Sequence, residues 1–320
     1  MARRKKGNPV SGWAIVDKPE GIGSTQVVGK VRRYFNAQKA GHAGTLDPLA
    51  TGILPIALGE ATKTLPFIVD SGKVYRFTVR WGVETDTLDR EGEVTATRDA
   101  RPTRDAVEAV LPAFTGEIEQ TPPAYSAIKV DGERAYDMAR RGEAPEMKPR
   151  LVQIDTLMLV DCPDDDTATF ETACGKGTYI RSLARDLAKA LGTVGHVIAL
   201  RRLRVGPFDE TRAQPLDAFL VDTPEKPLEP AAVIGHNPPR EGKLLPLQTA
   251  LDGIPAINVT EAETQRLRQG QPVSLLRKID FDRVRTIEPG TVLLAVQKDQ
   301  AIALVQFEKA LLKPVRVFNP

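Results

Sequence analysis

The feature that most constrains the fold is a strictly alternating segment at residues 73–82, KVYRFTVRWG. One face of this segment carries Tyr75, Phe77, Val79 and Trp81, and the other carries Arg76, Thr78 and Arg80. A period of two predicts a β-strand with one buried face and one polar face, which is typical of antiparallel sheets.

Further strand and helix patterns follow one another without the regular rhythm of a parallel βαβ sheet. Strand patterns lie at 12–19, 124–130, 150–160 and 167–174. Helical patterns lie at 24–35, 104–114 and 175–192, and we expect Ser24 or Thr25 to cap the first of them. This mixture predicts an α+β fold around a mostly antiparallel sheet.

The chain changes character between residues 221 and 246, where proline is frequent and periodicity is weak. This segment predicts a long loop or linker. Beyond it, short strand-like runs at 271–276, 291–297 and 301–307 indicate a small β barrel or sandwich. We therefore expect a first domain over residues 1–245, which includes the proline-rich segment 221–245, and a small β-rich domain over residues 246–320.

Composition argues against several classes of protein. The chain has no run of eighteen apolar residues, and its start, MARRKKGNPV, lacks the apolar core of a signal peptide. We therefore expect a cytoplasmic protein with no membrane partner. Cys162 and Cys174 are too few and too far apart for a zinc ribbon or a CxxC pair, and the three histidines are scattered, so we expect no metal site.

Charge is unevenly distributed along a chain whose net charge is only +2. The first 40 residues hold nine Lys or Arg against two acidic residues, whereas acidic residues cluster at 161–166. Two interpretations remain open at this point. The basic region either forms a face for a polyanion or is a solvated tail followed by a polar helix face.

The stretch AGHAGTLDPLATG (40–52) holds three glycines together with His42 and Asp47. Asp47-Pro48 fits the start of a helical turn, because Asp is a favoured N-cap and Pro a favoured first residue. Alternatively, the glycines let backbone approach a ligand toward which Asp47 points as a nucleophile or base. The two interpretations are compatible, and turn filling is the plainer interpretation for His42.

Several common catalytic motifs are missing from the sequence: the serine elbow, the Walker loop, the dinucleotide fingerprint and HExxH. An enzyme built on this chain is therefore expected to work through a carboxylate and without a cofactor.

Six motifs in order carry a resemblance to a known family. They are GWAIVDKPEGIGS (12–24), AGHAGTLDPLATGILPIALGEATK (40–63), KVYRFTVRWG with ETDT, Asp89 and Glu91-Gly92 (73–92), TPPAYSAIKVDGERAYDMAR (121–140), GTYIRSLARDL (177–187) and GHVIALRRLRVGPF (195–208). Over nearly all of the first 210 residues the chain closely resembles the bacterial tRNA pseudouridine-55 synthases of the TruB type. RLRQGQPVSL and the ending KPVRVF look like the PUA-like RNA-binding domain that follows the catalytic domain in this family.

The resemblance implies isomerisation of uridine-55 in the T loop of tRNA to pseudouridine. It implies Asp47 as the nucleophile, Tyr75 as the tyrosine that packs on the uracil, with a role as a base left open, and Arg181 as the partner of the aspartate. Further substrate-binding positions implied by the family motifs are Tyr179 and Leu200 in the uridine pocket, His42 in the space of the flipped base, and Lys18 and Lys63 in pocket support or RNA contact.

The chemistry makes these residue types reasonable. A stacked base is out of reach, so the nucleotide is flipped out of the loop, and an aromatic side chain can hold it. Desolvation disfavours a charged carboxylate, whereas a guanidinium such as that of Arg181 favours it. Attack of Asp47 on C1′, attack on C6, and a glycal formed after loss of the C2′ proton all remain open.

The partner expected on this basis is tRNA, bound through its T arm by a monomer. The RRLR run at 201–204 and the early basic residues are expected to meet phosphates. A second hypothesis is an RNA-binding folding chaperone for tRNA in which catalysis is secondary. A glycosidase-like hydrolase is a third, which lacks a second carboxylate for acid catalysis.

Overall fold

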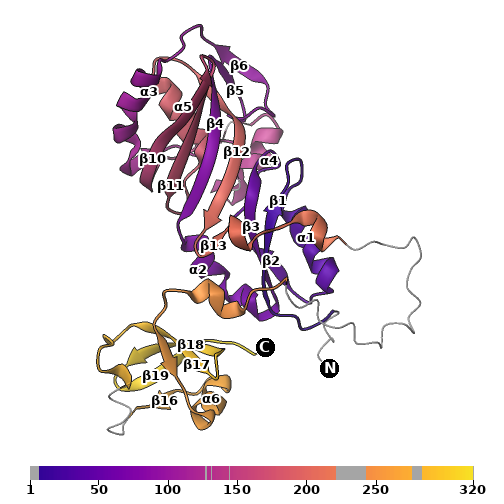
Figure 1. The fold of residues 1–320 in the computed structure, drawn as a ribbon, viewed down its shortest axis with the longest axis vertical. Helices are drawn as coiled ribbons and strands as arrows, with labels where there is room; N and C mark the ends of the chain where they lie inside the picture. Colours follow the sequence, from indigo (N-terminus) through magenta and orange to yellow (C-terminus); the bar gives the residue numbers. More distant parts are fainter. Residues whose placement is uncertain are drawn as a thin grey trace, which may run out of the picture.

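The computed structural model describes residues 7–126, 128–130, 132–143, 145–220, 243–275 and 283–319. A ten-stranded sheet dominates its upper part, and a smaller C-terminal sheet lies below it (Figure 1). Two main sheets, with two further two-stranded sheets, therefore make up the described part of the molecule, and helices pack against both main sheets.

The strands of the large sheet run in the order β14-β1-β3-β12-β4-β11-β10-β7. They are β1 (Gly12–Lys18), β3 (Thr51–Leu58), β4 (Lys73–Trp81), β7 (Gly116–Gln120), β10 (Arg150–Asp164), β11 (Thr167–Cys174), β12 (Gly195–Val205) and β14 (Gln214–Pro215). The short strands β2 (Ala40–His42) and β13 (Phe208–Asp209) pair with β3 and β12. Only the pairs β1–β14 and β3–β12 are parallel among the described strands of this sheet, so the expectation of a mostly antiparallel sheet is confirmed.

Helices α1 (Ser24–Phe35), α3 (Arg104–Val110) and α5 (Ile180–Ala190) contribute to the main core. In α5 the buried side chains include Ile180, Leu183 and Leu187, because they recur every three or four residues on one face. They pack with Phe77 and Trp81 from the buried face of β4. The alternation of residues 73–82 therefore produces the half-buried strand that the sequence predicts.

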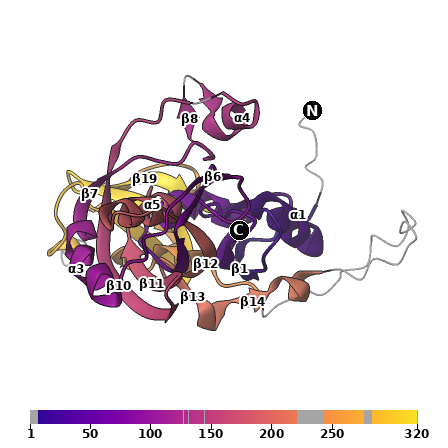
Figure 2. The same cartoon turned by 90° about the horizontal axis from the view of Figure 1, so that it is seen from above.

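Smaller elements complete the first domain. They are α2 (Leu65–Asp70), β5 (Val83–Thr85), β6 (Val94–Thr97), β8 (Lys129–Val130), β9 (Glu133–Arg134), α4 (Ala135–Arg140) and the 3-10 helices at Gly59–Thr64, Leu111–Phe114, Glu210–Arg212 and Leu216–Phe219. Seen from above, α4 and β8 stand apart from the large sheet (Figure 2).

The C-terminal sheet has the order β15-β17-β18-β19-β16. Its strands are β15 (Ala256–Asn258), β16 (Val273–Ser274), β17 (Val292–Gln297), β18 (Gln300–Glu308) and β19 (Leu311–Val317), accompanied by the 3-10 helix Leu247–Leu251 and by α6 (Glu261–Arg268). One apolar cluster combines Trp13 and Phe208 of the large sheet with Leu251, Leu304 and Phe318. The two sheets therefore share a buried joint.

Some local expectations are wrong. Gly23, and not Ser24 or Thr25, caps α1, because the Ser24 hydroxyl is used elsewhere. The strand expected at 124–130 is reduced to Lys129–Val130, although Ala127 lies outside the described residues. Most of the proline-rich segment, residues 221–242, also lies outside them. Within the described ranges, no helix has the length and apolar character needed to cross a membrane.

Candidate active site

Asp47 lies in the connection between β2 and β3, and its backbone is held from two sides. The Ser24 hydroxyl donates to the Leu46 carbonyl (2.9 Å) and accepts from the Leu46 N–H (2.8 Å). Lys18 is fully buried, and its Nζ donates to the carbonyls of Pro19 (2.9 Å), Ile22 (2.8 Å) and Pro48 (3.2 Å). The Asp47 carbonyl closes a turn by accepting from the Ala50 N–H (3.1 Å). Asp47-Pro48 thus opens a turn, and no helix follows it.

The glycines of this stretch make room for protein, whereas the sequence suggested a ligand. Gly44 and Gly52 have φ values of +96° and +97°, which favour glycine. A Cβ at Gly52 would lie 2.2 Å from the Arg202 carbonyl oxygen, and one at Gly44 would lie 3.3 Å from Arg202 Nη1. A Cβ at Gly41 would lie 3.0 Å from Leu65. Close packing around Arg202 therefore accounts for two of the three glycines.

Arg181 connects Asp47 to two other loops. It lies in the first turn of α5, and its side chain is only 7% exposed. Its Nη2 lies 2.9 Å from the Asp47 carboxylate and donates to the Tyr125 carbonyl (2.9 Å), while Nη1 donates to the Thr87 carbonyl (2.8 Å) and lies 3.5 Å from Asp89. A planar guanidinium suits this task because its donors point in fixed directions.

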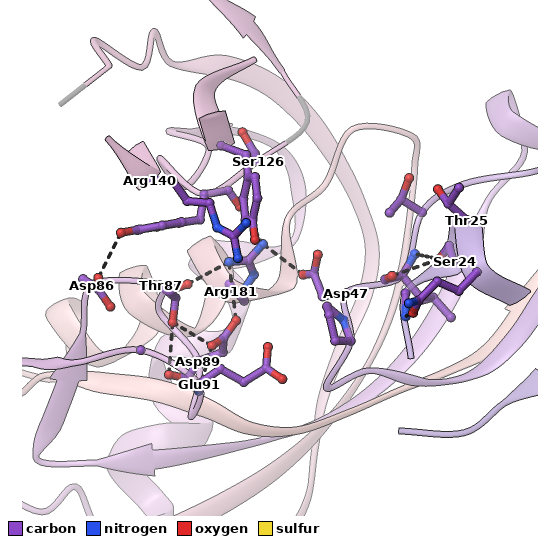
Figure 3. A pocket seen from close by; sticks show the side chains of 18 of the residues that line it. Ser24, Thr25, Asp47, Asp86, Thr87, Asp89, Glu91, Ser126, Arg140 and Arg181 are labelled. Carbon is purple, nitrogen blue, oxygen red and sulfur yellow. Dashed lines mark hydrogen bonds and ion pairs between the residues drawn. The ribbon is translucent and has the colours of Figure 1, made fainter. Parts of the chain in front are cut away.

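The Asp47 carboxylate faces a pocket of about 630 Å³ (Figure 3). Its charged lining consists of the acidic residues Asp47, Asp86, Asp89, Glu91 and Glu93 and the basic residues Arg140 and Arg181. The side chain of Asp47 is 38% exposed, whereas that of Arg181 is closed off. The carboxylate is therefore accessible on one side and held by a buried cation on the other.

Burial changes the proton affinity of the groups around Asp47. It lowers the pKa of Lys18 to about 8, although the Asp47 charge opposes this change. It raises the pKa values of Tyr75 and Tyr179, to which the Asp47 charge adds. It also raises the pKa of Glu91, together with the charges of Asp89 and Asp47. Of these groups, Lys18 donates to the carbonyl of Pro48, the neighbour of Asp47, and Glu91 lines the same pocket as Asp47.

The structure brings only some of the expected site residues to the pocket. Asp47 and Arg181 line it. The Asp47 charge raises the pKa values of Lys18, Tyr75 and Tyr179, which do not line the pocket.

Three expected residues are not among those that line this pocket. His42 is on β2 opposite Ile56, and Leu200 is a buried residue of β12 opposite Phe77. Burial, followed by the Arg202 charge, lowers the pKa of His42. Lys63 lies at the joint between the sheets, where its Nζ contacts Glu60 (2.6 Å) and the Val317 carbonyl (2.7 Å).

Several site residues were not expected from the sequence. Asp89, Thr87 and Tyr125 contact Arg181 directly, although only the quoted motifs at 84–92 and 121–140 signalled them. Arg202 is 1% exposed and donates to the Ile53 (2.8 Å) and Gly44 (3.0 Å) carbonyls. The expectation that the whole RRLR run meets phosphates is therefore wrong for Arg202, because its guanidinium is inside the protein.

The arrangement is suited to chemistry by a carboxylate. Asp47 offers an accessible oxygen beside a preorganised cation, in a pocket whose polar groups have fixed positions. Among the described residues, no group of three or more His, Cys, Asp or Glu side chains is arranged to hold a metal ion.

Comparison with known proteins gives the family. A model of the TruB family pseudouridylate synthase N-terminal domain matches residues 32–180, and a model of the tRNA pseudouridylate synthase B C-terminal domain matches residues 181–229. tRNA pseudouridine synthase B of Caulobacter vibrioides is 54% identical over 320 residues, which cover 100% of this chain and 99% of that protein. The protein of the same name in Rhodospirillum rubrum is 49% identical over 319 residues, with 100% of both chains covered.

Solved structures share the fold. A chain in a crystal structure of a Cbf5-Nop10-Gar1 complex has a TM-score of 0.67 at 23% identity, with 97% of this chain and 85% of that chain covered. A chain in a structure of an H/ACA RNP bound to a substrate RNA containing 2'-deoxyuridine has a TM-score of 0.68 at 20% identity, with 100% and 92% covered. With two family models and full-length relatives near 50% identity in agreement, this chain belongs to the TruB family of pseudouridylate synthases.

Proposed function

We propose that this protein isomerises uridine-55 in the T loop of tRNA to pseudouridine, with Asp47 as the nucleophile acting on a flipped nucleotide. The observation that carries the proposal is the Asp47 carboxylate, which lies 2.9 Å from Arg181 at an open pocket. The expected residue types for this reaction thus meet in a member of a pseudouridine synthase family.

The size of the pocket supports a flipped nucleotide as the substrate. Sites for small molecules commonly measure about 300–1,000 Å³, and this pocket has about 630 Å³. A base that reacts must leave its stack, at a cost of a few kcal/mol, and a preformed pocket offsets that cost.

The charge of the pocket indicates which part of the nucleotide enters. Five carboxylates line it against two guanidiniums, so a phosphate would be repelled while a neutral uracil would not. We therefore propose that the base enters and that the RNA backbone stays at the rim.

The remaining assignments belong to this proposal. Tyr75, Tyr179 and Leu200 contact the uracil, and His42 contacts the RNA near the flipped base. The unit over residues 1–245 is catalytic, and the PUA-like unit over residues 246–320 binds the RNA outside the T loop. The enzyme works as a monomer in the cytoplasm.

The test is release of tritium from T-arm RNA labelled at C5 of uridine, combined with mapping of pseudouridine in treated tRNA. Wild-type protein is expected to release tritium and to modify position 55, whereas Asp47→Asn is expected to do neither, because an amide is a far weaker nucleophile. Asp70→Asn, on an exposed pair with Lys176, is the matched control and keeps wild-type activity.

Three results would contradict the proposal. If wild-type protein releases no tritium, the proposed enzymatic activity is contradicted. If it modifies a different uridine, the proposed target position 55 is contradicted. Free uracil as the product would instead indicate a hydrolase. Full rescue of cells by Asp47→Asn would favour the chaperone, in which binding alone suffices.

A further inference from the structure

Arg202 is a buried arginine beneath the Asp47 loop. It is 1% exposed, and its Nε donates to the Ile53 carbonyl (2.8 Å). Its Nη2 donates to the Gly44 carbonyl (3.0 Å) and its Nη1 to the Thr45 carbonyl (3.5 Å). These carbonyls fix the plane of the guanidinium, because each donor of the fork is directed at a different backbone oxygen.

Tyr75 is the partner of Arg202 in the neighbouring strand. The two residues are opposite each other where β12 pairs with β4, so their side chains project from the same face of the sheet, and the Arg202 guanidinium acts on the Tyr75 phenol. The register of this pairing shifts directly after Arg202, between the partners Tyr75 and Val74. Such an irregularity re-aims the side chains next to it.

The charge of Arg202 has no carboxylate beside it. Within the described part of the chain no Asp or Glu oxygen lies within 4.0 Å of its guanidinium, although Arg181 and Arg201 both have such partners. A buried cation is costly unless it is hydrogen-bonded or paired. Tyr75 is the cross-strand neighbour of Arg202, and its phenol can itself become an anion.

We propose that Arg202 is a positioning residue for the reaction, whose anchored guanidinium holds the phenolic oxygen of Tyr75 in place and stabilises negative charge on it. This inference rests on the proposed function, in which Tyr75 contacts the uracil, and it adds that Tyr75 takes up a proton during the reaction. The Tyr75 phenolate takes the proton from C5 of the reattached uracil, the electron pair of that C–H bond re-forms the C5–C6 double bond, and Tyr75 is left as a neutral phenol.

The other charged groups around this pair act in both directions. Burial raises the pKa of Tyr75, the Arg202 charge and hydrogen bond oppose that rise, and Cys174 and Asp47 add to it. The Arg202 charge also lowers the pKa values of Lys18, Lys73 and His42. Arg202 is therefore the group that favours the phenolate.

The experiment uses two substitutions and a matched control. Arg202→Lys keeps the charge but cannot reach the Ile53 and Gly44 carbonyls and the phenol together, and Arg202→Met removes the charge. Arg76→Met is the control, because Arg76 follows Tyr75 on β4 but is exposed and pairs with Glu171 at the surface. Single-turnover tritium release is expected to fall about a hundredfold in Arg202→Lys and further in Arg202→Met, with little change in the control.

A spectroscopic readout separates positioning from simple packing. The five tyrosines are replaced by 3-fluorotyrosine, and the Tyr75 resonance is identified by its absence in Tyr75→Phe. Its titration in the free protein is expected to move to higher pH in Arg202→Lys and more so in Arg202→Met. This measurement needs no RNA, so it stands apart from the test of the proposed function.

A double-mutant comparison completes the test. In the Tyr75→Phe background the loss caused by Arg202→Lys is expected to shrink by about tenfold, because the two residues act on the same step. An unmoved Tyr75 titration in the folded Arg202→Lys protein, or an equal loss in both backgrounds, would overturn the proposal and leave Arg202 a structural residue.

Discussion

Two lysines, each in a different motif of the family, lie in two different regions of this protein. Lys18 lies under the Asp47 loop, is fully buried, and donates only to backbone carbonyls. Lys63 lies at the joint between the two sheets, where it is partly exposed and connects Glu60 with Val317 of the last strand. One lysine holds a loop within the large sheet, and the other holds the two sheets together.

The difference shows how the protein uses buried charge. Around Asp47, the cations Lys18, Arg181 and Arg202 hold backbone oxygens, and so they fix the shape of loops. At the joint, Trp13, Leu304 and Phe318 belong to one buried apolar cluster, which supplies the contact area. The Glu60–Lys63 ion pair adds a single polar contact beside it. The active region is therefore expected to depend on single polar groups far more than the joint does.

The largest effect is expected at Arg181. Arg181→Met removes the partner of Asp47 and the donors to Thr87 and Tyr125, so the rate of tritium release should fall by at least about a thousandfold. Arg185→Met, one turn further along α5, is the control and should retain activity. A residual rate within tenfold of wild type would contradict the expectation that the active region depends on single polar groups more than the joint does.

Lys18→Met is expected to reduce stability more than any change at the joint. It leaves three carbonyls without their donor, which should lower the free energy of unfolding by about 3 kcal/mol. Urea unfolding measures this value, and a loss smaller than that of Lys63→Met would contradict the comparison.

Lys63→Met is expected to have a small effect. Its side chain is 27% exposed, so losing the pair with Glu60 should cost about 1 kcal/mol or less. Activity on an isolated T-arm hairpin should stay within about twofold of wild type, since the pocket is untouched. A complete loss of activity on the hairpin would place Lys63 in RNA contact after all.

A further expected effect is a dependence of stability on pH. Burial lowers the pKa values of Lys18 and Lys73 to about 8, from 10.5, so above pH 8 the unfolded chain holds more protons than the folded one. The free energy of unfolding should therefore rise with pH from about 8 to about 9, by at most about 1.4 kcal/mol per pH unit for each lysine. At higher pH, Cys174 opposes this trend. Burial raises the pKa of its thiol to about 11, so the folded protein keeps a proton that the unfolded chain has already lost.

Urea unfolding of wild type and Lys18→Met at several pH values checks this expectation. The variant should show a smaller rise, because one of the two lysines is gone. Equal slopes would indicate that Lys18 keeps its proton in the folded protein.

The sequence alone predicted several of the regular elements, and its motifs pointed to the family. The alternation of residues 73–82 and the helical period of residues 180–190 both depend on neighbours a few positions away, and the structure confirms both. The family motifs also pointed to Asp47 and Arg181, which do meet at the pocket.

Only the tertiary structure decided how the charged groups are used. The sequence could not show that Gly44 and Gly52 make room for Arg202, that Ser24 bonds to Leu46 instead of capping α1, or that Lys63 belongs to the joint. Each of these contacts joins segments that are more than twenty residues apart, and no local period records which carbonyl a buried cation will reach. Because a buried donor must find an acceptor wherever the fold places one, its partner is a property of the assembled sheets and not of the sequence around it.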